Sequence, residues 1–118
     1  MVIVVDEFAD LILSGSQPQA FSELIQHFAQ LTRAYGIFLV LATQRPSEDV
    51  ITGSIKTNLS ARIAFFLPSS RDSMTVLDRP GAEDLLGDGD LLFYKSGRVE
   101  RLPALFVSAA DVRAVLNS

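Results

Sequence analysis

The stretch Val2-Ile3-Val4-Val5-Asp6-Glu7 decides how the fold is interpreted. Four consecutive β-branched residues are typical of a parallel strand that is buried on both faces. Two acids follow at the point where this strand should end. In open parallel sheets, ligands bind beyond the carboxyl ends of the strands. The sequence therefore predicts a binding site at Asp6 and Glu7.

Outward from this stretch, apolar strand-like runs alternate with segments of helical periodicity. Strands that alternate with helices imply a parallel sheet with right-handed crossovers, so we expect an α/β fold that forms one unit over residues 1–118. The expected elements are a helix over 19–35 that ends at Gly36, a strand over 37–42, a short helix over 51–59, a strand over 62–67, a short helix over 70–77, a β-hairpin over 91–107 and a final helix capped by Ser108.

Composition excludes several classes of function. The chain of 118 residues contains no cysteine, which excludes disulfides and thiolate metal sites, and its single histidine, His27, falls off the apolar stripe of its helix. The net charge of −4 argues against a general nucleic-acid binder, so any DNA contact must come from a few local basic residues. No apolar run approaches the ~20 residues that a transmembrane helix needs.

A second polar pair, Thr43-Gln44, follows the strand predicted over 37–42. It should lie beside Asp6 and Glu7 at the same edge of the sheet. A strand that ends in Asp-Glu is the Walker B pattern, in which the aspartate holds Mg²⁺ and the glutamate polarises the attacking water. Gln44 would then contact the γ-phosphate or the same water. Many strands also end in acids that only solvate a loop, so the pattern alone leaves that reading open.

The order of motifs along the chain closely resembles the FtsK/SpoIIIE family of DNA-translocating ATPases, from the Walker B segment onward. The resemblance covers roughly residues 2–116. It rests on residues 2–11 (VIVVDEFADL), 39–47 (LVLATQRPS), 49–53 (DVITG), 55–56 (IK), 62–65 (RIAF), 72–73 (DS), 76–78 (VLD), 81–83 (GAE), 85–87 (LLG) and 89–91 (GDL).

This resemblance implies a partial RecA-like P-loop NTPase fold, with a mainly parallel sheet, flanking helices and a C-terminal β-hairpin. It also implies a hexameric ring around double-stranded DNA, with ATP and Mg²⁺ between neighbouring subunits, on the cytoplasmic side of the membrane. By position, Asp6 is expected to hold the metal, Glu7 to be the catalytic glutamate, and Thr43 and Gln44 to contact the nucleotide, with Gln44 as the sensor.

The resemblance further implies an arginine that reaches into the neighbouring subunit's site. Arg62 and Arg45 are both candidates, and an alternative for Arg62 is a strand residue paired with a surface acid. Lys56 and Arg71 are the expected DNA contacts, although ordinary solvated charge is an alternative for each. The acids Glu83, Asp84, Asp88 and Asp90 are interpreted as a solvated turn because their spacing fits no calcium loop.

One family feature is absent from the sequence. No Gly-x-x-x-x-Gly-Lys-Ser/Thr segment occurs, and this loop would supply the phosphate cradle. In the family this loop lies upstream of Walker B, in the N-terminal half of the motor, and without that half a gap would remain between the strands over 37–42 and 62–67. We therefore expect either that the chain is a fragment of a longer polypeptide or that it fills the gap by oligomerising, by swapping strands or by bringing the two strands together. The isolated chain is expected to be inactive. Two alternatives stay open: an FtsK-like ATPase of conjugation or type VII secretion, and a non-catalytic remnant that serves as an assembly module.

Overall fold

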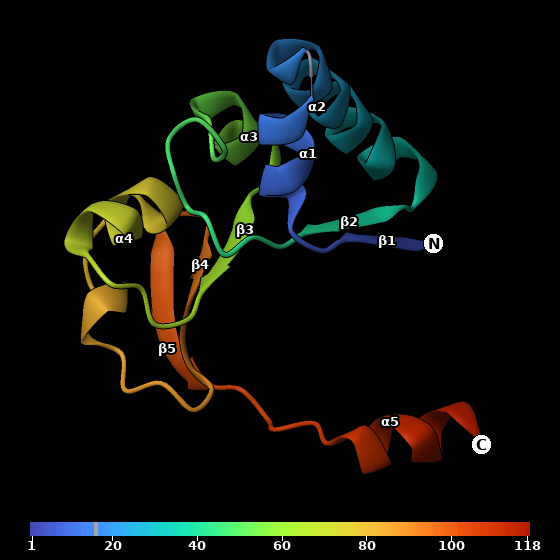
Figure 1. The fold of residues 1–118 in the computed structure, drawn as a ribbon, viewed down its shortest axis with the longest axis vertical. Coiled ribbons are helices and arrows are strands. Elements are labelled where there is room, and N and C mark those ends of the chain that lie inside the picture. The colour runs from blue at the N-terminus through green and yellow to red at the C-terminus, as the bar shows by residue number, and fades with distance from the viewer. Residues whose placement is uncertain (16) are drawn as a thin grey trace.

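The computed structural model describes residues 1–15 and 17–118 (Figure 1). The chain contains both strands and helices, which form two units that each have a small hydrophobic core. The elements are β1 (Val2–Val5), α1 (Phe8–Ser14), α2 (Pro18–Tyr35), β2 (Phe38–Leu41), α3 (Gly53–Asn58), β3 (Ala61–Ala64), α4 (Ser70–Leu77), a 3₁₀ turn η1 (Ala82–Asp84), β4 (Asp90–Lys95), β5 (Arg98–Pro103) and α5 (Ala109–Leu116).

The first unit is a parallel pair of strands covered on one face by helices. β1 pairs with β2 in the register Val2 to Phe38 and Val4 to Val40. These four side chains share a face of the pair and are exposed, whereas the alternate residues point toward the helices. The core of this unit consists of Phe8, Ala9, Ile12, Ile25, Val50 and Ile55. The predicted strand pair is confirmed, and α1 is a helix that was not predicted.

Helix α2 agrees with its prediction and ends for the predicted reason. Its residues before Gly36 keep helical backbone geometry, and Gly36 then adopts φ 65°, a left-handed conformation that glycine tolerates without steric cost. The Gly36 N–H donates to the Thr32 carbonyl, which closes the last turn. The chain enters β2 two residues later, and β2 lies beneath α2 in Figure 1.

The second unit is an antiparallel sheet in the order β3-β4-β5, which corrects the expectation of a mainly parallel sheet. The Leu67 N–H donates to the Ala82 carbonyl (3.2 Å), so the chain after α4 returns to the end of β3. β4 therefore starts where β3 ends and runs back along it. The predicted hairpin is confirmed as β4 and β5, although β5 stops at Pro103. The core of this unit is Ala64, Leu77, Ala82 and Leu85.

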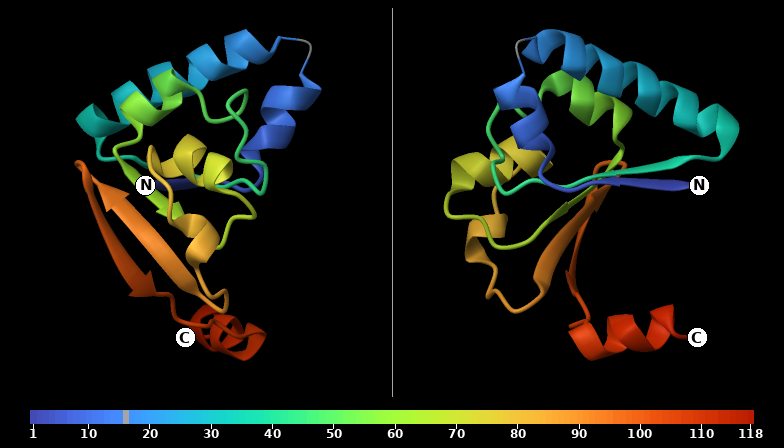
Figure 2. Two further views of the ribbon diagram at one scale, coloured as in Figure 1. Left: turned by 90° about the vertical axis from the view of Figure 1, so that its left-hand side faces the viewer. Right: turned by 45° about the vertical axis from the view of Figure 1, so that its right-hand side comes forward.

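Strands β2 and β3 are not hydrogen-bonded to each other, and each has a single partner strand in the described part of the chain. The expected gap between these two strands is therefore present. A hollow of about 340 Å³ lies beside them, lined by residues that include Thr32, Phe38, Leu59 and Ala61. The two views of Figure 2 show the β1–β2 pair and the antiparallel sheet as separate layers that meet near α3.

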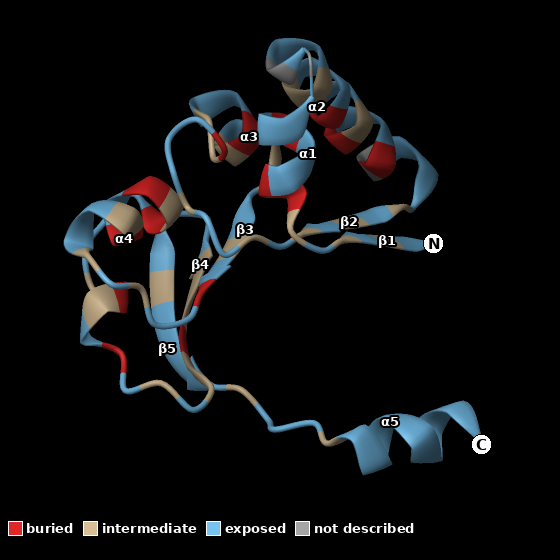
Figure 3. Ribbon diagram, viewed as in Figure 1, coloured by how far each residue is buried: buried red, intermediate tan, exposed pale blue. Residues whose placement is uncertain are grey.

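Helix α5 extends away from both units. None of its residues is buried, although Val112, Val115 and Leu116 are apolar, and the preceding Leu105 and Phe106 are almost fully exposed (Figure 3). The Cα radius of gyration is 15.4 Å, above the ~13.5 Å expected of a compact chain of this length. The open arrangement leaves large apolar surfaces uncovered. None of the described helices is long and apolar enough to cross a membrane.

Candidate functional site

The ends of β1 and β2 form one corner of the first unit. The Ala42 N–H donates to the Val5 carbonyl, and the Phe8 N–H donates to the Ala42 carbonyl (both 2.9 Å). These two bonds fix the chain on either side of Asp6 and Glu7. Glu7 itself has φ 51° and ψ 60°, a left-handed conformation that is uncommon for a residue with a Cβ. The turn aims its side chain at the loop that follows β2.

Both oxygens of the Glu7 carboxylate accept hydrogen bonds from that loop. The Thr43 hydroxyl donates to one oxygen (2.5 Å), and the Gln44 backbone N–H donates to the other (2.9 Å). The Arg45 N–H in turn donates to the Thr43 hydroxyl oxygen (3.0 Å). The Thr43 hydroxyl, followed by the Gln44 amide, lowers the pKa of Glu7 below its ordinary value. The structure thus brings Glu7, Thr43 and Gln44 together, but through the main chain of Gln44.

Asp6 lies beside this corner and is exposed. Carboxylate oxygen is the hard donor that Mg²⁺ prefers, and Mg²⁺ commonly binds through one or two carboxylates plus waters and phosphates. The described residues contain no group of three or more His, Cys, Asp or Glu side chains that could enclose a metal ion. Asp6 therefore fits a shared Mg²⁺ site, to which other groups would have to contribute, and does not fit an all-protein cage.

The two candidate arginines differ in what surrounds them. Arg45 is exposed (63% of its side chain), and its nearest carboxylate, that of Asp10, is 3.8 Å away. Arg62 is 12% exposed. Its guanidinium donates to the Asp78 carboxylate (2.6 Å) and the Val76 carbonyl (2.9 Å), and it stacks on the Tyr94 ring, 4.0 Å from the centroid. The geometry of Arg62 is thus that of a strand residue paired with an acid, the alternative to an arginine that reaches a neighbouring subunit.

Asp78 is a charged centre of the structure that was not predicted from the sequence. Its carboxylate accepts from Lys56 (2.6 Å) as well as from Arg62, so it joins α3 of the first unit to β3 and α4 of the second. Both cations lower the pKa of Asp78, Lys56 most. Its backbone is left-handed (φ 59°) where it caps α4. No local pattern identifies it, because both partners lie far away in the sequence.

The other predicted contacts are spread over both units. Lys56 is held in the pair with Asp78, whereas Arg71 is exposed in the first turn of α4. The acidic turn is more ordered than expected of solvated acids. Asp90 accepts two hydrogen bonds from Arg101, which lower the pKa of Asp90 to about 2, and Glu83 accepts the Gly81 N–H.

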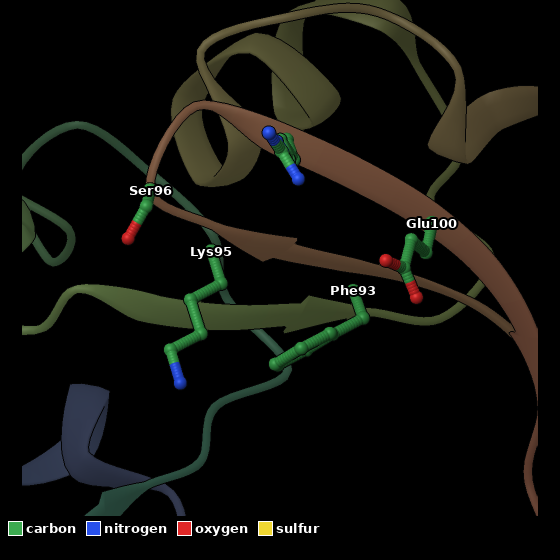
Figure 4. Close-up of a pocket in the computed structure, with 5 residues that line it drawn as sticks. Phe93, Lys95, Ser96 and Glu100 are labelled. Carbon is green, nitrogen blue, oxygen red and sulfur yellow. The ribbon is translucent and has the colours of Figure 1, made fainter.

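A hollow of about 400 Å³ opens on the uncovered face of the β4–β5 hairpin. Figure 4 shows Phe93, Lys95, Ser96 and Glu100 around it, with the Lys95 and Phe93 side chains on the same side of the sheet. Its lining, completed by Arg98, includes none of the residues predicted for the nucleotide corner. The hollow and the corner at Glu7 are therefore separate features of the surface.

Known proteins resemble this chain along its whole length. The model of the FtsK/SpoIIIE family matches residues 1–48. A DNA translocase FtsK from Haemophilus ducreyi is 50% identical over 120 residues, which cover 100% of this chain and 12% of that protein. One from Sporosarcina ureae is 50% identical and is matched over 99% of this chain and 15% of its own length. The chain therefore spans a small part of these relatives.

Two solved structures share the fold. The pCW3 conjugation coupling protein TcpA, in a monomer form with ATPγS, superposes with a TM-score of 0.85 and 29% identity over 98% of this chain and 36% of that one. The cytoplasmic domain of the type VII secretion ATPase EccC from Thermomonospora curvata gives a TM-score of 0.81 and 32% identity, over 91% of this chain and 12% of that one. The arrangement of strands and helices described above thus recurs in larger proteins.

Proposed function

Because the chain belongs to the FtsK/SpoIIIE family, we propose that it contributes the Walker B corner of an ATP-driven double-stranded DNA translocase. In this proposal the chain works in the cytoplasm, in a hexameric ring, and with a motor half that carries the phosphate-binding loop. The isolated chain is then inactive as an ATPase. Cell division and chromosome segregation are the processes that such a motor would serve.

The observation that carries the proposal is the shared corner of Asp6, Glu7 and the loop after β2. A glutamate held by two hydrogen-bond donors at the carboxyl ends of parallel strands is in the place where α/β folds bind ligands. The two donors keep the carboxylate ionised and fix its orientation, so that its remaining lone pairs can accept a hydrogen bond from the attacking water. About 50% identity to DNA translocases over the whole chain supports the assignment of ATP as the nucleotide and DNA as the cargo.

In the proposed mechanism each residue of the corner has one task. Asp6 would hold Mg²⁺, which when bound neutralises the charge that develops on the transferring phosphate. Glu7 orients the attacking water and takes its proton. The Gln44 side chain, adjacent to the amide that holds Glu7, senses the terminal phosphate. Thr43 lies beside Glu7, and its hydroxyl donates to the Glu7 carboxylate.

The exposure of each basic side chain indicates which of them could reach a neighbouring subunit or DNA. Arg45 is the better candidate for reaching a neighbouring subunit, because the Arg62 guanidinium is already occupied by Asp78, Val76 and Tyr94. Arg71 is exposed at the surface, where it could meet a DNA phosphate, and Lys56 would first have to leave Asp78. A ring motor can hold DNA with a few such residues because several subunits contribute at once.

The gap between β2 and β3 supports the proposal of a second motor half. The uncovered edges of β2 and β3, together with the hollow beside them, would accept the phosphate-loop strand. The exposed apolar face that carries Val2, Val4, Phe38 and Val40 would be covered by the helix that follows it. Burial of these side chains would provide the free energy that joins the two halves.

A complementation assay tests the proposal. The chain is mixed with an N-terminal half that carries the phosphate loop of a related motor, and DNA-stimulated ATP hydrolysis is measured. Hydrolysis should appear only when both halves are mixed, and its rate should fall by about 100-fold or more with Glu7→Gln. Asp10→Asn, a nearby exposed acid, is the matched control and should retain activity. Silence of two halves that demonstrably bind each other would contradict the proposal and favour a non-catalytic assembly module.

A motor that moves another cargo is the second candidate. The structural likeness to a conjugation coupling protein and to a type VII secretion ATPase favours it, although their identities of 29% and 32% are lower than those of the DNA translocases. The same mixture discriminates between the two. Hydrolysis that is insensitive to double-stranded DNA would favour conjugation or secretion, whereas stimulation by any duplex of sufficient length would favour the translocase.

A further inference from the structure

We infer that Thr43 is a positioning residue for the Glu7 carboxylate and is not a nucleotide contact, an inference that rests on the function proposed above. The side chain of Thr43 has one proton to donate, and that proton points at Glu7. A hydroxyl that donates to the carboxylate has no second proton to offer a phosphate. Its role is therefore separate from those of Asp6 and the Gln44 side chain.

The Thr43 hydroxyl is itself held in place. Its oxygen accepts the Arg45 N–H at 3.0 Å, which occupies one lone pair and leaves the proton directed toward Glu7. The branched Cβ of threonine also restricts χ1, so the hydroxyl is held by covalent geometry as well as by its hydrogen bond. Thr43 thus links the backbone of the Arg45 loop to the carboxylate that would act on water.

Two donors are needed to fix the carboxylate. With the Gln44 N–H alone, the plane of the Glu7 carboxylate could rotate about that single contact. The Thr43 hydroxyl on the second oxygen removes this freedom and sets the oxygen lone pairs that face the reacting centre. Catalytic groups commonly need support of this kind, because a misplacement of about 1 Å reduces rates by about 100-fold.

The predicted kinetics follow from this role. In the complementation mixture, Thr43→Val should lower kcat by about 10-fold or more and leave the KM for ATP within about 2-fold, because it removes an interaction that matters in the transition state. Thr43→Ser should recover most of the rate. Thr57→Val is the matched control, since Thr57 is an exposed threonine that donates to the Gly53 carbonyl of its own helix. It should leave both constants unchanged.

Two measurements separate positioning from a structural role. In a Glu7→Gln background, Thr43→Val should cause little further loss if Thr43 acts through Glu7, because residues that act as a unit are not additive. In the isolated 118-residue chain, exchange of the Gln44 amide hydrogen should be faster in Thr43→Val than in the unsubstituted chain, and fastest in Glu7→Ala, which removes its acceptor.

Each outcome decides something. An increase in the KM for ATP with kcat unchanged would overturn the inference and make Thr43 a nucleotide contact. An equal loss from Thr43→Val with glutamate or glutamine at position 7 would also overturn it. If the two halves bind each other and the mixture does not hydrolyse ATP, the proposed function fails, and the Gln44 exchange rates alone decide whether Thr43 holds Glu7. Equal Gln44 exchange in the unsubstituted and Thr43→Val chains would then refute the inference as well.

Discussion

Glu7 and Asp78 are carboxylates in similar backbone settings, and they differ in the partners that hold them. Both have left-handed backbones (φ 51° and 59°), and both have pKa values below the ordinary range. The partners of Glu7 are a hydroxyl and an amide, which are neutral. The partners of Asp78 are two cations, and one of them, Arg62, is largely buried.

This difference separates a reactive carboxylate from a structural one. Neutral donors orient the Glu7 carboxylate without cancelling its charge, so it stays available to a proton or to a polarised water. The charge of the half-exposed Asp78 carboxylate is compensated by two cations, and it is needed to neutralise the largely buried Arg62 guanidinium. A lowered pKa marks both residues, and the nature of the partner tells which role applies.

The largest effect on stability is expected at Asp78. Asp78→Asn keeps the shape of the side chain and tolerates the left-handed backbone, but it leaves the Arg62 guanidinium without its carboxylate. Because Asp78 is half exposed, we expect a loss of about 2 kcal/mol in the free energy of unfolding, below the full cost of breaking a buried pair. Urea denaturation measures it.

Asp10→Asn is the control for this prediction. Asp10 is also paired with an arginine, but the distance of 3.8 Å and the exposure of both side chains make the pair weak. The expected loss is below about 0.5 kcal/mol. Equal losses at positions 10 and 78 would show that water screens Asp78 as effectively as it screens Asp10, and the contrast with Glu7 would then disappear.

The comparison also predicts a pH dependence. The folded-state pKa of Asp78 lies below its ordinary value of 3.8, with Lys56 the larger cause and Arg62 the second. The stabilisation from this carboxylate is therefore fully present above pH ~4 and is lost as the pH falls through the lower folded-state value. The difference in unfolding free energy between the unsubstituted chain and Asp78→Asn should be constant from pH 7 to 5 and narrow below pH 4. A difference that widened in acid would contradict the ion pair.

The parts of the fold that were predicted correctly depend on local signals. The helix over 18–35 follows from its apolar period and from Gly36, and β1 and β2 follow from continuous apolar runs. The corner at Glu7 was also predictable, because the carboxyl ends of adjacent parallel strands meet at one edge. That the Gln44 amide, and not its side chain, holds Glu7 depends on loop geometry that no residue pattern encodes.

Two features could not be predicted because they depend on long-range geometry. A strand, a helix and another strand usually imply parallel pairing, but the segment after α4 returns to Leu67 and reverses the direction of β4. Asp78 follows a short helix, as many surface acids do, and its partners are 16 and 22 residues away in the sequence. The role of Arg62 was undecided for the same reason.

Glycine substitution compares the two left-handed sites directly. Glu7→Gly relieves a backbone conformation that costs a residue with a Cβ roughly 1–2 kcal/mol. The hydrogen bonds that it removes are those that Glu7 accepts from the exposed loop after β2. We expect its melting temperature to be equal to or above that of the unsubstituted chain, while hydrolysis in the complementation mixture is lost. Asp78→Gly gains the same relief but leaves Arg62 without its carboxylate partner, so its melting temperature should fall. A fall of equal size at both sites would show that Glu7 is also structural.

The smallest effect is expected at Lys56, the second partner of Asp78. Lys56→Met removes the contact of 2.6 Å, but Asp78 stays neutralised by Arg62, and the methionine retains the apolar stem of the lysine. We expect a loss below about 1 kcal/mol in the free energy of unfolding, measured by urea denaturation. Arg62→Met should cost more, because it also leaves Asp78, the Val76 carbonyl and the Tyr94 ring without their partner.

A double-mutant cycle of each substitution with Asp78→Asn should give the larger coupling energy for Arg62. Equal couplings would mean that Lys56 is as structural as Arg62, which would remove it from the candidates for DNA contact. A small coupling instead leaves Lys56 able to exchange Asp78 for a phosphate, because its departure does not leave the carboxylate unpaired.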